Sequence, residues 1–255
     1  MDVSVVIATH NRHEGCARAV ASVLAQQPPA REVIVCDDGS HDATRARFTA
    51  WAQDEPRVTY LRREQSAGGP GPARNMGTHA ARGRWLAFLD DDDEWLPGKL
   101  AAQAPWTEDG RADVIATNAR RSSGGVYFPQ LAAPWMPSRR ELLHDNPLIL
   151  SSTVVRRDLV AATRGFPTAR RVAGIEDYLL WMALSDRGAR FVVLPDVLVR
   201  YEDGGEAARM SNRDLQAAIA LTSWRRWARR PWDPLLLRAA VNQSHKALSA
   251  RPQHC

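Results

Sequence analysis

The chain has 255 residues, of which 44% are hydrophobic and 25% charged, and its formal net charge at pH 7 is +5. This is the composition of a globular protein that is long enough for one large domain or two small ones. It contains no run of about 18 apolar residues, so we expect no transmembrane helix. Mild basicity suits anionic partners such as phosphates, nucleic acid or lipid headgroups, without choosing among them.

The first hundred residues alternate between strand and helix patterns. The opening MDVSVVIATHNR has an acid at its second position and predicts a buried strand, not a secretion signal. We expect strands at Val3–Ala8, Glu32–Cys36, Val58–Leu61 and Trp85–Leu89, separated by helices at Glu14–Gln27, Asp42–Gln53 and Ala73–Arg82. Such alternation predicts an α/β fold with a parallel sheet and right-handed crossovers.

After about residue 110 the alternation loosens. The patterns predict strands at Asp113–Thr117, Val126–Phe128, Ser151–Val155 and Phe191–Leu194, and helices at Ile175–Asp186, Asp214–Arg229 and Pro234–Leu248. This half is less regular, so it says less about topology.

Polar clusters follow three of the early strands. The first strand ends in THNR, the second in DDGS, and the strand at Trp85–Leu89 runs into four consecutive aspartates. Ligands of open parallel sheets bind at the carboxyl ends of the strands, so we expect these clusters to meet at one site.

The aspartate run Asp90–Asp93 needs a compensating charge, because neighbouring carboxylates repel one another. A hard divalent cation such as Mg²⁺ or Mn²⁺ would supply it, since such ions take a few carboxylates together with phosphates and water. The alternative is a solvated acidic turn that caps the next helix. A calcium loop is excluded, because its required glycine and glutamate positions hold Trp95 and Ala101.

The segments VSVVIATHNR, VIVCDDGSHDAT and GGPGPARNMGTHAARGRWLAFLDDDDEWLPGKL resemble glycosyltransferase family 2. The resemblance covers roughly residues 2–105, with weaker echoes in SSTVVRR and GIEDYLLWMAL. It implies the GT-A fold, a mostly parallel central sheet flanked by helices, with a C-terminal acceptor-side region and terminal helices. The implied division is a nucleotide-sugar-binding subdomain at 1–105, an acceptor-binding and catalytic subdomain at 106–211, and a helical extension at 212–255.

The resemblance also implies a donor site. The nucleotide would be held by Asp38 and by the first strand end, which comprises Ala8, Thr9, His10, Asn11 and Arg12. Most relatives have tyrosine where this chain has His10, and either ring can lie against a base. The other interpretation of His10 is a loop histidine satisfied by its neighbours.

In the same resemblance Arg74 helps to hold the donor nucleotide, although a surface helix arginine would look the same in sequence. Asp90 and Asp91 would face the ribose. Asp92 is the expected direct ligand of Mn²⁺ or Mg²⁺, together with Asp90, and the metal would neutralise the diphosphate as the sugar leaves.

The pair Glu176-Asp177 matches the catalytic acids of the family. Asp177 would be the base that takes the proton of the acceptor hydroxyl, with Glu176 in support and Trp181 near the acceptor. The alternative is an acidic first helical turn favoured by the helix dipole.

Two departures from the family pattern matter. Residues 198–211 contain no histidine to complete the metal site; Glu202 or Asp203 could replace it, Arg209 could meet the diphosphate, or no third protein ligand exists. The tract SWRRW lacks the glutamine of processive synthases, which favours one sugar per encounter.

The tract 224–232, WRRWARRPW, admits two interpretations. It could contact a membrane surface, or it could pack its tryptophans inward with solvated arginines outside. Three cysteines without metal-type spacing indicate reduced thiols, so we expect a cytoplasmic protein with an option of peripheral contact at the inner membrane face.

The sequence therefore predicts a metal-dependent inverting glycosyltransferase. Its donor would be a UDP-, GDP- or dTDP-sugar. Its acceptor would be a saccharide, a lipid-linked precursor, a natural product or a protein. We expect no nucleic-acid partner. Two alternatives stay open. A sugar nucleotidyltransferase would need a glycine-rich loop after the first strand, and a non-catalytic binding module would not need both Asp92 and Asp177.

Overall fold

The structure is a computed structural model that describes residues 1–204 and 212–249. Its strands are β1 (Val3–Thr9), β2 (Glu32–Asp37), β3 (Val58–Arg62), β4 (Trp85–Asp90), β5 (Glu94–Trp95), β6 (Val114–Arg121), β7 (Val154–Arg156) and β8 (Phe191–Tyr201). Its helices are α1 (His13–Leu24), α2 (Thr44–Asp54), α3 (Gly71–Ala80), α4 (Lys99–Glu108), α5 (Arg139–His144), α6 (Arg157–Ala161), α7 (Glu176–Ser185), α8 (Asn212–Arg229) and α9 (Pro234–Ser249), with short 3₁₀ helices η1 (Leu150–Ser152) and η2 (Arg170–Val172).

The described strands form one sheet in the order β3-β2-β1-β4-β7-β6-β8-β5. The N-terminal strands β3, β2, β1 and β4 are parallel, as the alternation predicts. The short strand β7 joins β4 to β6 by antiparallel pairing, and β8 then runs parallel to β6. The sheet is therefore mostly parallel and continuous across the expected subdomain boundary at 105/106, which falls inside α4; the division into subdomains stays a prediction.

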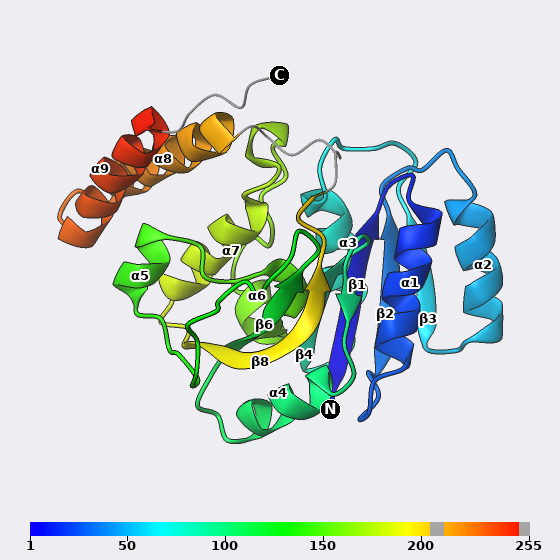
Figure 1. Ribbon diagram of the computed structural model, residues 1–255. Helices are drawn as coiled ribbons and strands as arrows, with labels where there is room; N and C mark the ends of the chain where they lie inside the picture. Colours follow the sequence, from blue (N-terminus) through cyan, green and yellow to red (C-terminus); the bar gives the residue numbers. More distant parts are fainter. Residues whose placement is uncertain (205–211, 250–255) are drawn as a thin grey trace.

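Helices cover both faces of the sheet (Figure 1). One face packs a core cluster with residues of α1 and α2, including the fully buried Phe48, and the other packs a cluster with residues of α3 and α7. Gly77 allows the close approach of α3, because a Cβ there would lie 2.5 Å from Val6 and 2.6 Å from Cys36. This double burial explains the continuous apolar runs of β1 and β2.

In the second half, two expected strands do not form as predicted, the expected strand at Phe191–Leu194 continues to Tyr201 as β8, and the helices α5 and α6 were not predicted. Val126–Phe128 is not a strand. Val126 makes one isolated bridge to Arg120 after a glycine turn, and the residue after Phe128 is Pro129, which has no N–H to continue a ladder. The expected strand at Ser151–Val155 begins as η1 and becomes β7 only at Val154.

Helices α8 and α9 pack side by side at the end of the molecule remote from β3 and α2 (Figure 1). Leu236 and Ala239 of α9 and Ile219 of α8 share a third apolar cluster with Tyr178 and Met182 of α7. Among the described residues, no helix combines the length and the apolar character needed to cross a bilayer.

Candidate active site

The polar ends of β1, β2 and β4 meet at one rim of the sheet, as predicted. The register pairs Ala8 with both Cys36 and Asp90, so the residues that follow these strands are neighbours. Thr9 Oγ1 donates to Asp91 Oδ2 at 2.8 Å, and the N–H of Asn11 donates to Ser40 Oγ at 2.9 Å.

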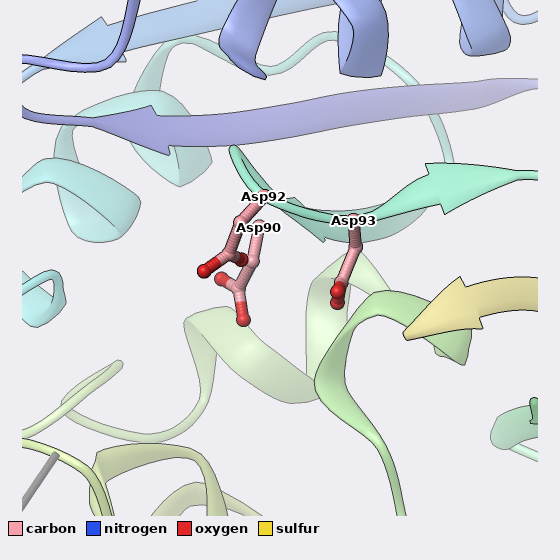
Figure 2. A group of neighbouring side chains, drawn as sticks. All are labelled: Asp90, Asp92 and Asp93. Carbon is pink, nitrogen blue, oxygen red and sulfur yellow. The ribbon is translucent and has the colours of Figure 1, made fainter. Parts of the chain in front are cut away.

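The turn after β4 brings Asp90, Asp92 and Asp93 together. One carboxylate oxygen from each lies within 4.8 Å of the others, and Figure 2 shows all three side chains projecting from the same side of the turn. The next helix, α4, begins only at Lys99, so these carboxylates do not cap it. The alternative of a helix-capping acidic turn is therefore excluded.

Asp93 is a member of this cluster that the sequence did not single out. It is buried, and its carboxylate accepts from Ser151 Oγ of η1 and, at 2.7 Å, from the N–H of Glu202. Burial, and then the charge of Asp90, raises its pKa well above the ordinary range. Ser151 also accepts from the N–H of Asp90 at 3.1 Å, so η1 fixes the shape of the acidic turn.

Arg12 lies between two of the acids. Its guanidinium donates to Asp92 at 2.7 Å and to Asp91 at 3.1 Å. Burial raises the pKa of Asp91 to about 6 despite the hydrogen bond from Thr9 and the charge of Arg12. A cavity of about 310 Å³ opens here, lined by residues 11–15, Arg18, Asp91 and Asp92.

Arg74 is buried and bridges the two halves of the site. Its guanidinium donates to Asp90 Oδ1 at 2.6 Å and to Glu176 Oε1 of α7. Burial alone would lower the pKa of this guanidinium, but the charges of Asp90 and Glu176 raise it, so Arg74 stays positively charged. The interpretation of Arg74 as a surface arginine is thus wrong.

Asp177 is the second residue of α7 and follows Glu176 of this bridge. Burial and then the charge of Glu176 raise its pKa to about 7. Asn146 Nδ2 lies 3.4 Å from Asp177 Oδ2, and Asp177 Oδ1 accepts from the N–H of Tyr178. A carboxylate with a pKa near neutrality is suited to accept a proton.

Trp181, one turn further along α7, does not lie at an open surface. Its side chain is 0% exposed and belongs to the core cluster under α3 and α7. Trp181, expected near the acceptor, therefore cannot contact an acceptor directly. The helix buries nearly all of its circumference, and sequence periodicity could not reveal that.

The remaining donor-side candidates have local partners. Asp38 is buried and accepts from Ser66 Oγ at 2.8 Å and from the N–H of Ala67 at 2.9 Å. His10 is exposed, with Nδ1 lying 3.0 Å from the carbonyl oxygen of Asp38 and Nε2 3.1 Å from Asn11 Nδ2. These contacts hold the imidazole over the junction of β1 and β2.

The suggested substitutes for the missing histidine point elsewhere. Asp203 accepts from Arg121, Ser122 and Ser123 at the end of β6, and Glu202 accepts from Ser122. Glu202 contributes its backbone N–H to the cluster instead, through Asp93. Arg209 lies outside the described residues.

The acidic cluster has the donor chemistry for a hard divalent cation. All its ligand atoms are carboxylate oxygens, the type that Mg²⁺ and Mn²⁺ prefer. Both oxygens of Asp93 already accept hydrogen bonds, so Asp90 and Asp92 have the freer carboxylates. The residues therefore fit such an ion.

The tract 224–232 fits neither a purely membrane-facing helix nor one with its tryptophans inward and its arginines outside. Arg226 turns inward and donates to Asp186 Oδ2 at 2.5 Å. Trp224 and Trp232 remain exposed, and so do Arg225 and Arg229.

The sequence model described as glycosyl transferase family 2 matches residues 4–155. The chain is 34% identical over 209 residues to the succinoglycan biosynthesis protein ExoO of Rhizobium meliloti, a match that covers 76% of this chain and 58% of ExoO. It is 29% identical over 182 residues to the UDP-Glc:α-D-GlcNAc-diphosphoundecaprenol β-1,3-glucosyltransferase WfgD of Escherichia coli, covering 71% of this chain and 69% of WfgD. The chain thus spans about three fifths to two thirds of the length of these two relatives.

Solved structures resemble the whole chain. S. aureus TarS 1–349 matches 98% of it with a TM-score of 0.74 at 20% identity, and the match covers 73% of that 1–349 chain. The mannosyltransferase PcManGT of Pyrobaculum calidifontis, solved with GDP-Man and Mn²⁺, also matches 98% with a TM-score of 0.72 at 19% identity, over 72% of its own chain. The likeness confirms the predicted GT-A fold.

Proposed function

Because this chain belongs to glycosyltransferase family 2, we propose that it transfers a sugar from a nucleoside-diphosphate sugar to an acceptor hydroxyl, with inversion and with the help of a divalent cation. The observation that carries the proposal is the Arg74 bridge. It joins Asp90 at the acidic cluster to Glu176, which adjoins Asp177. A cation-binding group and a proton acceptor are thereby held side by side, as sugar transfer requires.

The donor would lie along the rim formed by β1, β2 and β4. His10 offers an exposed ring to the base, while Asp38 fixes the loop at 66–67 beside it. Asp90 and Asp91 would face the ribose. Arg12, now paired with Asp91 and Asp92, is a cation within reach of the diphosphate. That TarS was also solved with UDP-GlcNAc and PcManGT with GDP-Man supports a donor of this class.

Asp92 and Asp90 would hold the cation, Mn²⁺ or Mg²⁺, with Asp93 shaping the turn from behind. When bound, such an ion offsets the negative charge that grows on the departing diphosphate. Asp177 would take the proton of the acceptor hydroxyl, and Asn146 would orient its carboxylate. Arg74 would pair with Glu176 and position the first turn of α7.

A lipid-linked acceptor is the class that the comparisons favour. The name of WfgD specifies a diphosphoundecaprenol-linked acceptor. The chain itself offers a surface for a membrane: Leu221, Trp224 and Ala228 follow one another at helical spacing along α8 and are exposed. Between residues 219 and 248 the chain has five arginines, of which Arg226 turns inward to Asp186, and one lysine, but a single acid, Asp233, which Arg139 pairs. This basic, tryptophan-bearing surface suits anionic headgroups.

The test is turnover of a panel of UDP-, GDP- and dTDP-sugars with Mn²⁺, by the wild type, Asp177→Asn and the matched control Asp145→Asn, whose side chain is exposed. We expect Asp177→Asn to retain donor binding, seen as thermal stabilisation, and to lose about 10²- to 10⁴-fold in turnover. Equal turnover by Asp177→Asn and wild type would refute the assignment of the base. Donor binding without turnover by the wild type would favour a non-catalytic module.

A further inference from the structure

A second cavity, of about 320 Å³, lies in the acceptor-side half and shares no lining residue with the cavity at Arg12. It is lined by Tyr127, Phe128, Pro129, Gln130, Leu131 and Trp135. Three of these side chains are aromatic, and Tyr127 is 36% exposed. The volume lies at the lower end of the range for small-molecule sites, so the cavity suits one ring better than a long chain.

The backbone holds this cavity in shape. Asn118 of β6 accepts from the N–H of Phe128 and donates to its carbonyl oxygen, both at 3.0 Å. Trp135 exchanges two backbone hydrogen bonds with Val193 of β8, at 2.9 and 2.8 Å. The aromatic rings are therefore carried by segments fixed to the sheet, so little ordering has to accompany ligand binding.

One lining residue of the cavity, Tyr127, is connected to the acidic cluster through Tyr201 and Glu202. The Tyr127 ring meets Tyr201 edge-on at 5.8 Å, and the N–H of the next residue, Glu202, donates to Asp93. Burial, and then carboxylates that include Asp145 and Asp177, raises the pKa of Tyr127. The phenol is thus within electrostatic reach of the candidate base.

The cavity is also backed by packed core residues. Phe128, Leu131 and Trp135 pack on the core cluster of the sheet face that α3 and α7 cover. Trp181 belongs to the same cluster, but it is fully buried and is not itself an acceptor contact.

We propose that this cavity binds a pyranose ring of the acceptor, with its C–H face on Tyr127 and Trp135. This inference rests on the proposed glycosyl transfer and names the part of the acceptor that the chain recognises. Aromatic faces suit the apolar face of a sugar, whereas its hydroxyls need polar partners at the edge. Gln130 in the lining and Arg121, whose guanidinium lies 5.8 Å from the centre of the Tyr127 ring, provide such groups.

The experiment is saturation-transfer NMR of the full chain with the methyl glycosides of glucose, galactose, mannose, N-acetylglucosamine and N-acetylgalactosamine, without any donor. n-Hexanol serves as an apolar-chain probe. The variants are Tyr127→Ala, Tyr127→Phe and Trp135→Phe, and Trp232→Ala removes an exposed ring elsewhere as the matched control. Far-UV and near-UV circular dichroism verify that each variant is folded.

We expect at least one glycoside to receive saturation at its ring protons. Its affinity should fall about five- to tenfold in Tyr127→Ala and stay near the wild-type value in Tyr127→Phe and Trp232→Ala. Trp135→Phe, which keeps a smaller ring, should give an intermediate loss. Binding of no glycoside, binding of hexanol alone, or equal binding by Tyr127→Ala would overturn the inference.

The proposed transfer activity can fail separately. A wild type that binds glycosides through Tyr127 but is not stabilised by any nucleotide sugar with Mn²⁺ would retain this sugar site and refute the transfer activity. A wild type that binds nucleotide sugars but no glycoside would refute this sugar site and leave the proposed transfer activity standing.

Discussion

Arg74 and Glu176 form a buried ion pair between residues 102 positions apart in the chain. The same guanidinium holds Asp90, so one cation neutralises carboxylates from β4 and α7. The position of α7 relative to the acidic cluster therefore depends on this one side chain.

Removing Arg74 should be costly. In Arg74→Ala two carboxylates lose their shared cation in a buried site, and we expect the free energy of unfolding to fall by about 3–5 kcal/mol in urea titrations. Arg74→Lys should lose less, because it keeps a cation in the site, but it should still be less stable than the wild type, because an ammonium cannot hold both carboxylates as a planar guanidinium does. Arg31→Ala, which breaks an exposed pair with Asp2, is the control and should cost less than about 1 kcal/mol. Similar losses in Arg74→Ala and Arg31→Ala would show that the bridge is not structural.

The raised pKa of Asp177 predicts a pH dependence of stability in protein treated with a chelator. An acid whose folded-state pKa is about 7, against 3.8 ordinarily, favours folding fully below about pH 4 and loses this contribution as the pH rises through 7. Relative to Asp177→Asn, the wild type should therefore lose on the order of 3 kcal/mol between pH 4 and pH 8. Parallel stability curves for the two proteins would contradict the burial of this charge.

His10 should contribute a ring, not a specific hydrogen bond, to the donor. His10→Ala should weaken donor binding roughly tenfold, in the range of base stacking on aromatic side chains, while His10→Tyr should leave it nearly unchanged. Calorimetric titration with the best donor of the panel measures both. His79→Ala, an exposed histidine of α3, is the control, and an equal loss in His10→Tyr and His10→Ala would exclude stacking.

The surface of α8 and α9 should bind anionic vesicles. Sedimentation with phosphatidylglycerol vesicles should be reduced in Trp224→Ala/Trp232→Ala and in Arg225→Gln/Arg229→Gln, each arginine contributing about 1 kcal/mol, and should weaken with salt. Phosphatidylcholine vesicles should bind little. Arg45→Gln/Arg47→Gln on α2 removes the same charge far from this surface and should have no effect (Figure 1). Binding that survives both mutated pairs would assign the contact to another surface.

The sequence predicted the N-terminal sheet because local signals are strong there. From apolar runs, prolines and polar strand ends, every strand and helix up to β4 was predicted with bounds correct to within a few residues. The same signals predicted that Thr9, Asn11 and the aspartates would lie at one rim of the sheet. What failed depends on partners distant in sequence. Asp93 joins the cluster through Ser151 and Glu202, which no local pattern connects, and Trp181 is buried because α7 is covered on nearly all sides. Val126–Phe128 has strand composition, but it makes only one isolated bridge to β6, from Val126 to Arg120, before Pro129.

The central claim is that the carboxylates after β4 hold a divalent cation that the donor needs. Its most direct test is calorimetric titration of chelator-treated protein with Mn²⁺, and then with the donor, in the wild type and in Asp92→Asn. We expect one Mn²⁺ site in the wild type, at least tenfold tighter donor binding once it is filled, and loss of both in Asp92→Asn. Donor binding that is equally tight with and without Mn²⁺, and equal in the two proteins, would contradict the claim.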